Sequence, residues 1–217
     1  FEKFSNNYFN IIQHYSNKYN YNLSKIEISK LNYLNKEEIY KIVNEYKNRS
    51  IFLVPLKNIA SEIRQNKWIK SVKIKSNYHN ALEIILIEEI PIGIYDNNNQ
   101  KLLFSSNLVF IEILKNENKY NNLIIFSGEN SINNSINLIS ILNDKSILGV
   151  RKAEFIENRR WDLKLKNQIK LKLPEFNIPK AIENYHKLYE NLSYSELKDI
   201  EIIDLRITNQ AIIKYRD

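Results

Sequence analysis

Cysteine is absent from this chain of 217 residues, which contains only three glycines and four prolines. Without cysteine there is neither a disulfide framework nor thiol chemistry, although this absence fits either redox compartment. So little glycine and proline argues against a disordered or fibrous chain. No apolar run approaches the roughly 20 residues of a membrane-spanning helix, and no signal-peptide pattern is present.

The net charge is +7, from 32 lysines and arginines against 25 acidic residues, and 43% of the residues are hydrophobic. This hydrophobic content supports a core in one large domain or two modest ones. The basic residues are scattered through the expected strands and helices, which favours a solvated basic surface. Nucleic-acid binding would require clustered basic residues together with exposed aromatic residues, or a known binding module, and the sequence shows neither such a cluster nor such a module. A weak attraction to an anionic membrane surface fits the same charge.

Patterns typical of catalysis or metal binding are missing. His14, His79 and His186 are far apart and have no cysteine or carboxylate at metal-ligand spacing. Glu88 and Glu89 are neighbours in an expected strand, so they point to opposite faces and cannot share a proton. No glycine-rich phosphate loop or nucleophile elbow is present. We therefore expect no enzymatic activity, no cofactor and no metal.

The first 90 residues predict a helix followed by a β-α-α-β-β unit. Apolar side chains at spacings of three and four predict that residues 1–21 form a helix with one stripe, made of Phe4, Tyr8, Ile11, Ile12, Tyr15 and Tyr19. Packing on the following domain and a stalk outside a membrane are both compatible with this stripe. A strand near residues 25–34, a helix capped by Asn35, a helix opened by Pro55, and strands at 67–75 and 81–88 follow.

A hairpin is the clearest pattern in the second half, at residues 153–174. Apolar residues alternate with charged ones on both sides of the polar break Asn167-Gln168. This pattern predicts a hairpin with one buried and one solvated face, whose core residues are Trp161, Leu163, Ile169 and Leu171. Short strands are expected at residues 92–95, 102–104, 108–113, 200–207 and 211–216, and helices at 131–142 and from Pro179 to about residue 192.

Five motifs occur in an order that points to a known family. In the β-α-α-β-β unit, Trp68 opens the second strand and residues 88–91, Glu-Glu-Ile-Pro, close the third. Segments at 102–110 and 123–128 follow, then Arg-Arg-Trp at 159–161 and Ile-Asp-Leu-Arg at 203–206. Over residues 23–215 the chain thus resembles the FtsQ/DivIB family of bacterial cell-division proteins. Asn107 stands where that family has glycine, so we expect Asn107 to adopt positive φ in a turn.

The resemblance implies an α+β fold in three segments. A juxtamembrane helix or stalk is expected at residues 1–22, a POTRA domain (β-α-α-β-β) at 23–91, and a mainly antiparallel β domain with flanking helices at 92–217. We assign structural roles to Trp68, Pro91, Trp161 and Asp204. Because the chain begins with phenylalanine, we expect a trimmed fragment, and the resemblance implies one transmembrane helix before Phe1. The implied location is the periplasmic side of the inner membrane, enriched at the division septum.

The implied function is a non-enzymatic scaffold of the divisome that controls septal peptidoglycan synthesis. In this family the C-terminal strand and adjoining hairpin bind FtsB, which acts in complex with FtsL. The corresponding contact positions are Arg159 or Arg160, Arg206, Ile207 and Tyr215. Alternatively, Arg206 pairs with Asp204 or Glu201, and Ile207 is plain core. We expect a partner strand to add beside residues 211–216, with Tyr215 as its aromatic anchor.

Another function is compatible with a POTRA domain: a component of an outer-membrane assembly or secretion system. Such a component would carry tandem POTRA units or a long alternating barrel. Residues 92–217 instead contain expected helices, and the chain has one such unit. A single apolar segment of about 20 residues ahead of Phe1 would support the scaffold, whereas a cleaved signal peptide would support the alternative.

Overall fold

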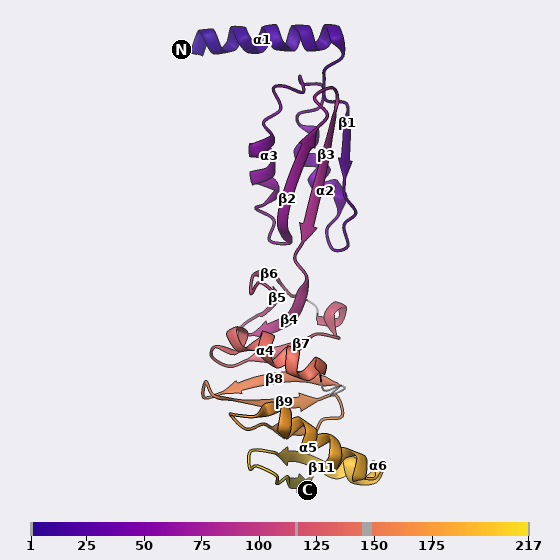
Figure 1. Cartoon of the computed structure of the whole chain (residues 1–217), viewed down its shortest axis with the longest axis vertical. Helices are drawn as coiled ribbons and strands as arrows, with labels where there is room; N and C mark the ends of the chain where they lie inside the picture. The colour runs from indigo at the N-terminus through magenta and orange to yellow at the C-terminus, as the bar shows by residue number, and fades with distance from the viewer. Residues whose placement is uncertain (1, 116, 145–148, 217) are drawn as a thin grey trace. The chain divides into compact units, whose positions relative to one another are not determined.

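The computed structural model describes residues 2–115, 117–144 and 149–216, so that Phe1 and Asp217 lie outside it. The chain divides into two compact units, between Glu89 and Ile90 (Figure 1). Pro91, which the predicted boundary assigns to the first domain, is the first residue of a strand in the second unit, β4 (Pro91–Asp96).

The first unit has the predicted β-α-α-β-β order. Its elements are β1 (Lys25–Ile28), α2 (Lys36–Asn44), α3 (Leu56–Ile63), β2 (Ile69–Ser76) and β3 (Ala81–Glu88). The sheet order is β1-β3-β2, with β1 parallel and β2 antiparallel to β3. Both helices pack on this sheet through apolar residues at helical spacing: Ile39, Val43, Ile59 and Ile63. Asn35 caps α2 as predicted, because its side chain accepts a hydrogen bond from the Glu37 N–H.

One carboxylate at the end of β3 ties down the loop between β1 and α2. Glu88 accepts hydrogen bonds from the backbone N–H groups of Asn32 at 2.6 Å, Tyr33 at 3.0 Å and Leu34 at 2.8 Å. The Tyr33 ring stacks on half-buried Trp68, with ring centroids 4.9 Å apart. Glu88 therefore fixes the loop and, through Tyr33, the stacking contact with Trp68, the residue just before β2.

Glu88→Ala is expected to lower the free energy of unfolding by about 2 kcal/mol, because three backbone donors lose one charged acceptor. Urea unfolding of the 217-residue protein measures this difference. Glu83→Ala is the matched control, since it removes only an exposed ion pair with Lys75 and should change stability by less than about 1 kcal/mol. Equal losses in the two variants would contradict the role assigned to Glu88.

α1 (Glu2–Tyr19) presents most of the described part of its predicted apolar stripe to solvent, although Ile12 is partly buried. More than half of the surface is exposed at Tyr8, Ile11, Tyr15 and Tyr19. Polar residues hold the helix to the first unit instead: Gln13 accepts a hydrogen bond from the Ser50 N–H at 2.8 Å, and the hydroxyls of Ser16 and Ser50 are 2.7 Å apart. The helix therefore contacts the first unit mainly through polar residues, and most of the predicted stripe is left exposed.

The second unit contains one nine-stranded sheet in the order β12-β11-β10-β9-β8-β7-β4-β5-β6. After β4, its strands are β5 (Lys101–Ser105), β6 (Phe110–Ile113), β7 (Ile124–Ser127), β8 (Val150–Ile156), β9 (Arg160–Leu165), β10 (Lys170–Lys172), β11 (Ile200–Asp204) and β12 (Ile212–Tyr215). Its helices are η1 (Glu117–Tyr120), α4 (Ser131–Asp144), α5 (Ile178–Asn191) and α6 (Tyr194–Asp199). Thus the predicted α+β class is confirmed.

The sheet is mixed, with antiparallel pairs predominating. The pairs β4–β7, β7–β8 and β10–β11 are parallel, whereas the other five are antiparallel. Parallel neighbours need crossover connections, and α4 joins β7 to β8 while α5 and α6 join β10 to β11. The strands β7 and β8 were not predicted from the sequence.

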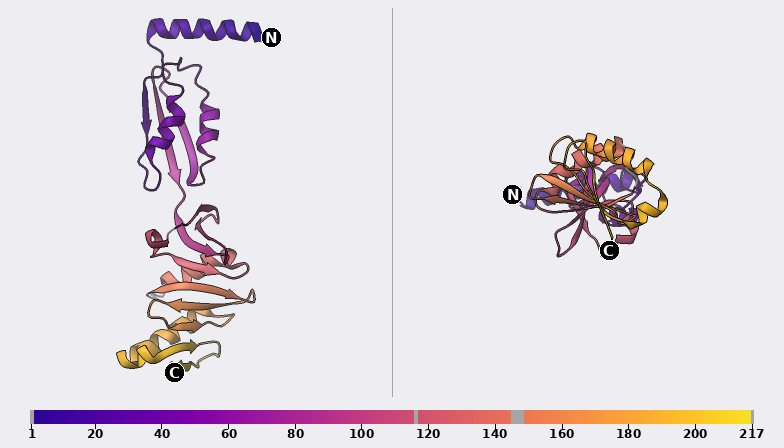
Figure 2. Two further views of the ribbon diagram at one scale, coloured as in Figure 1. Left: turned by 180° about the vertical axis from the view of Figure 1, so that it is seen from behind. Right: turned by 90° about the horizontal axis from the view of Figure 1, so that it is seen from below.

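α4 and α5 lie on the same face of this sheet, in front of it in Figure 1 and behind it in the left view of Figure 2. The row of residues facing them across β8 to β11 is fully buried: Ala153, Leu163, Leu171 and Ile203. Trp161 is 3% exposed and contacts Phe155 and Phe126, with ring centroids 4.6 and 5.8 Å away. The predicted hairpin and its core residues are confirmed.

Two local predictions in this unit are wrong. Asp162, expected on the solvated face of the hairpin, is buried. In the turn between β5 and β6, Leu108 rather than Asn107 has positive φ, at 59°. The Leu108 N–H donates to the Ser105 carbonyl at 2.9 Å, and its side chain packs against the core. Burial of an apolar side chain offsets the strain of this backbone conformation.

Candidate partner-binding site

β12 forms one edge of the nine-stranded sheet, and among the described strands it pairs only with β11. The two strands are antiparallel, with Ile203 opposite Ile213 and Asp204 opposite Ile212. Ile213 packs against the core, whereas Ile212 and Tyr215 are 55% and 50% exposed. An edge strand has a row of N–H and C=O groups with no strand partner, so a further strand can add there.

The sheet topology brings three predicted arginines together. β10 is antiparallel to β9 and parallel to β11, so the start of β9 lies beside the ends of β10 and β11. Arg159 and Arg160 stand at that start and Arg206 follows β11. All three line one depression of about 330 Å³, together with Pro174, Glu175, Phe176 and Thr208.

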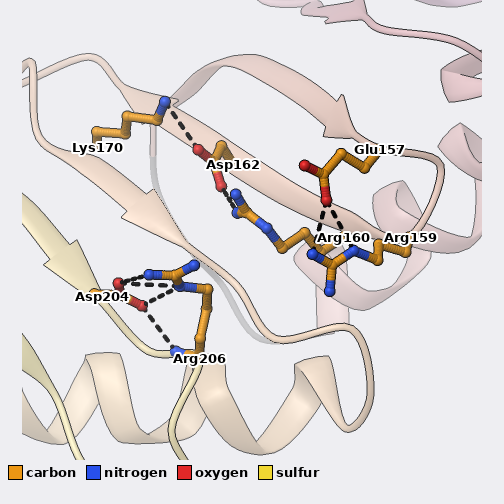
Figure 3. Close-up of polar contacts among 7 residues, drawn as sticks. All are labelled: Glu157, Arg159, Arg160, Asp162, Lys170, Asp204 and Arg206. Carbon is orange, nitrogen blue, oxygen red and sulfur yellow. Dashed lines mark hydrogen bonds and ion pairs between the residues drawn. The ribbon is translucent and has the colours of Figure 1, made fainter.

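Arg159 and Arg206 each donate to an acidic side chain two residues earlier in the chain, as Figure 3 shows. The Nη2 atom of Arg159 is 2.7 Å from Oε2 of Glu157. Arg206 donates through Nε and Nη2 to both carboxylate oxygens of Asp204, with Nη2 2.6 Å from Oδ2. Its Nη1 makes no hydrogen bond with the described residues. Both side chains remain about half exposed, at 53% and 46%.

The pairing of Arg206 with Asp204 agrees with the alternative that the sequence left open, whereas Glu201 pairs with Lys214. The hydrogen bonds from Arg206 lower the pKa of Asp204, and Asp204 in turn raises the pKa of Arg206. Both groups therefore stay charged around neutral pH. Asp204 thus holds the side chain of Arg206, which lines the depression.

Arg160 differs from the other two arginines because it is largely buried. Its side chain is 13% exposed and pairs with Asp162, which is 3% exposed and also forms an ion pair with Lys170, whose Nζ lies 2.8 Å from Oδ2 (Figure 3). The stems of these basic residues cover the carboxylate on what is otherwise the solvated face. Of the two candidate arginines before Trp161, Arg159 is thus the accessible one and Arg160 lies in a buried ion pair.

A smaller hollow of about 30 Å³ adjoins the arginines and is lined by Phe176, Asn177 and Ile207, among others. Ile207 is 51% exposed, so the alternative that it is plain core is wrong. Phe176 is 77% exposed and lines both hollows, although the sequence reasoning did not select it. The sequence feature that could have identified Phe176 is its position as an aromatic residue in a short loop, outside any apolar periodicity.

Tyr215 lies away from the arginines, at the opposite end of the β11–β12 pair. It stands opposite Ile200, whereas Ile212 stands opposite Asp204. Tyr215 is three positions after Ile212 along the strand, which corresponds to roughly 10 Å. The predicted contact residues therefore form two groups on one hairpin: the arginine depression with Ile207, and Tyr215 on the edge strand.

These features suit the binding of a peptide. The described residues contain no group of three or more histidine, cysteine, aspartate or glutamate side chains that could hold a metal ion. Among the described helices, none has the length and apolar character needed to cross a membrane. What the hairpin offers is an open strand edge, an exposed aromatic ring and charged donors for carboxylates.

Comparisons with known proteins give the family. The model of the FtsQ-type POTRA domain matches residues 21–89, and that of the C-terminal part of cell division protein FtsQ/DivIB matches residues 93–206. Cell division protein FtsQ of Rickettsia conorii is 30% identical over 200 residues, which cover 91% of this chain and 73% of that protein. The protein of the same name from Rickettsia typhi is 31% identical over 183 residues, covering 81% of this chain and 66% of its own length. The chain belongs to the FtsQ/DivIB family of cell-division proteins.

Proposed function

We propose that the chain is a non-enzymatic scaffold of the divisome that binds FtsB, in complex with FtsL, through its C-terminal hairpin. The observation that carries the proposal is the position of β12 as an edge strand next to the arginine depression. Membership of the FtsQ/DivIB family supports a role in cell division. By bringing these partners together, the scaffold would control septal peptidoglycan synthesis.

In the proposed complex, a strand of FtsB forms main-chain hydrogen bonds with the outer edge of β12. Tyr215 packs against the added strand as its aromatic anchor. Arg159 and Arg206 donate to carboxylates of the partner, and Arg206 can do so through Nη1 while it keeps its contact with Asp204. Ile207 and Phe176 supply apolar surface beside them.

The proposed location is the periplasmic side of the inner membrane, with enrichment at the septum and one transmembrane anchor in the full-length protein. The exposed stripe of α1 is compatible with a stalk at a membrane surface. A component of an outer-membrane assembly or secretion system is not favoured, because both domains match FtsQ-type models.

Tyr215→Ala is expected to weaken binding of a synthetic FtsB periplasmic-tail peptide by about 30-fold, since aromatic anchors typically contribute about 2 kcal/mol. The melting temperature should stay nearly unchanged, because Tyr215 is half exposed. Titration calorimetry with the peptide from the same organism measures the dissociation constant. Tyr194→Ala, at a tyrosine 75% exposed on α6, is the control and should bind normally. An unchanged dissociation constant for Tyr215→Ala would sink the docking proposal.

A further inference from the structure

A row of lysines crosses the second sheet on its outer face, which is opposite to α4 and α5. Lys152 of β8 stands opposite Lys164 of β9, and Lys164 stands opposite Lys170 of β10. The row continues through Ile202 of β11 to Lys214 of the edge strand β12. Neighbouring strands are about 4.8 Å apart, so this lysine row is roughly 19 Å long.

Only part of this charge is balanced. Lys170 pairs with Asp162 at 2.8 Å and Lys214 with Glu201 at 2.5 Å. Lys152 and Lys164 lie within 4 Å of no described carboxylate, although Lys164, after Lys214, contributes to the lowered pKa of Glu201. Like charges directly opposite each other destabilise a sheet, so the two lysines add an unfavourable term that the core does not require. A feature of this kind suits a binding surface, where an acidic partner removes the repulsion.

The next row of side chains on the same face has a different character. Glu154, Asp162, Lys172 and Asp204 stand opposite one another on successive strands from β8 to β11. Three of these four side chains are acidic, so the basic surface is a narrow line with a mainly acidic line beside it. A membrane surface or a nucleic-acid backbone would need basic residues spread over a wider area. The narrow lysine row instead fits a partner whose own charges form one line.

We propose that the lysine row binds an acidic α-helix of a partner protein, laid across the strands. Side chains three and four residues apart share one face of a helix and repeat with its pitch of about 5.4 Å. This repeat is close to the spacing of about 4.8 Å between strands, so successive helical turns can place carboxylates near the lysines of β8, β9 and β10 and, past Ile202 of β11, near Lys214. An extended partner repeats its same-face side chains only about every 6.7 Å, which matches less well. The contact does not depend on strand addition to β12.

The test uses two fluorescein-labelled peptides of about 18 residues, long enough to span the row as helices. The two peptides have the same composition of alanine, glutamine and glutamate and differ only in the order of these residues. One places its glutamates on a single helical face, and the other distributes them around the helix. In fluorescence anisotropy at low salt, we expect the single-face peptide to bind at least about tenfold more tightly than the other, with the preference reduced at physiological salt.

The double variant Lys152→Gln/Lys164→Gln should lose about tenfold in affinity for the single-face peptide. Its melting temperature should equal or exceed that of the parent, because the repulsion is relieved. The control Lys41→Gln/Lys57→Gln removes the same charge from exposed positions of the first unit and should bind like the parent. Equal binding of the two peptides, or equal losses in the two variants, would overturn the proposal. It would also fail if vesicles containing anionic lipid bound through Lys152 and Lys164 while neither peptide did.

Discussion

Asp162→Ala is expected to lower the free energy of unfolding by about 3 kcal/mol, the loss typical of breaking a buried ion pair from one side. Its carboxylate is 3% exposed and pairs with both Arg160 and Lys170. Lys170 is 36% exposed and can turn to solvent, whereas Arg160 is 13% exposed. The buried Nε of Arg160 already has no hydrogen-bond partner among the described residues. Alanine at position 162 would therefore leave a guanidinium largely buried without its counter-charge.

Denaturant unfolding of the 217-residue protein measures this loss, with Glu157→Ala as the matched control. Glu157 pairs with Arg159, another arginine two residues along the chain, but both partners are more than half exposed. Breaking that pair should leave the unfolding midpoint nearly unchanged, because exposed ion pairs contribute little. Adding Arg160→Met to Asp162→Ala should recover part of the stability, because it removes the uncompensated charge. Similar losses in Asp162→Ala and Glu157→Ala would show that the buried pair does not stabilise the fold.

The burial of Asp162 marks the limit of what local sequence patterns predict. Alternation within residues 161–173 was enough to identify the hairpin and to place Trp161 and Leu163 in the core. The same alternation predicted the face to which the Asp162 side chain points, but it did not predict that this side chain is buried. Its burial arises because Arg160 and Lys170, on the same strand and the next one, fold their side chains over it. Such coverage depends on strand register and side-chain direction, which a periodicity count does not contain.

Longer-range pairing limits the prediction of the sheet and of the site in the same way. The strands β7 and β8 are joined by a helix, so their parallel pairing depends on a crossover rather than on adjacent residues. The resemblance to a family supplied Arg159, Arg206 and Tyr215 as contact candidates. Their division into two groups follows from the pairing of β9, β10, β11 and β12, and the lysine row follows from a cross-strand register. Neither the two groups nor the lysine row can be predicted until the pairing of the strands is known.

Gly128 and Gly149 share one backbone conformation but differ in the space available to a side chain. This difference gives the other prediction with a large expected effect. Gly128 and Gly149 have nearly the same positive φ, +94° and +92°. A Cβ atom on Gly128 would lie 2.2 Å from the backbone oxygen of Phe155 in β8, whereas one on Gly149 would approach nothing closer than 3.5 Å, the Cβ of Lys166. The first contact is far too short to be relieved by turning a side chain, because its partner is main chain.

Gly149→Ala should therefore lower the free energy of unfolding by about 1 kcal/mol, the effect of a non-glycine residue at positive φ. Gly128→Ala should lower it by about 3 kcal/mol, because displacement of β8 adds to the same conformational term. Phe155 stands opposite Trp161, so that displacement also disturbs the core of the hairpin. Parallel urea titrations of the two variants measure the difference between them. Equal losses would mean that β8 moves freely enough to accept a methyl group, and that the close approach of Gly128 to Phe155 does not constrain the fold.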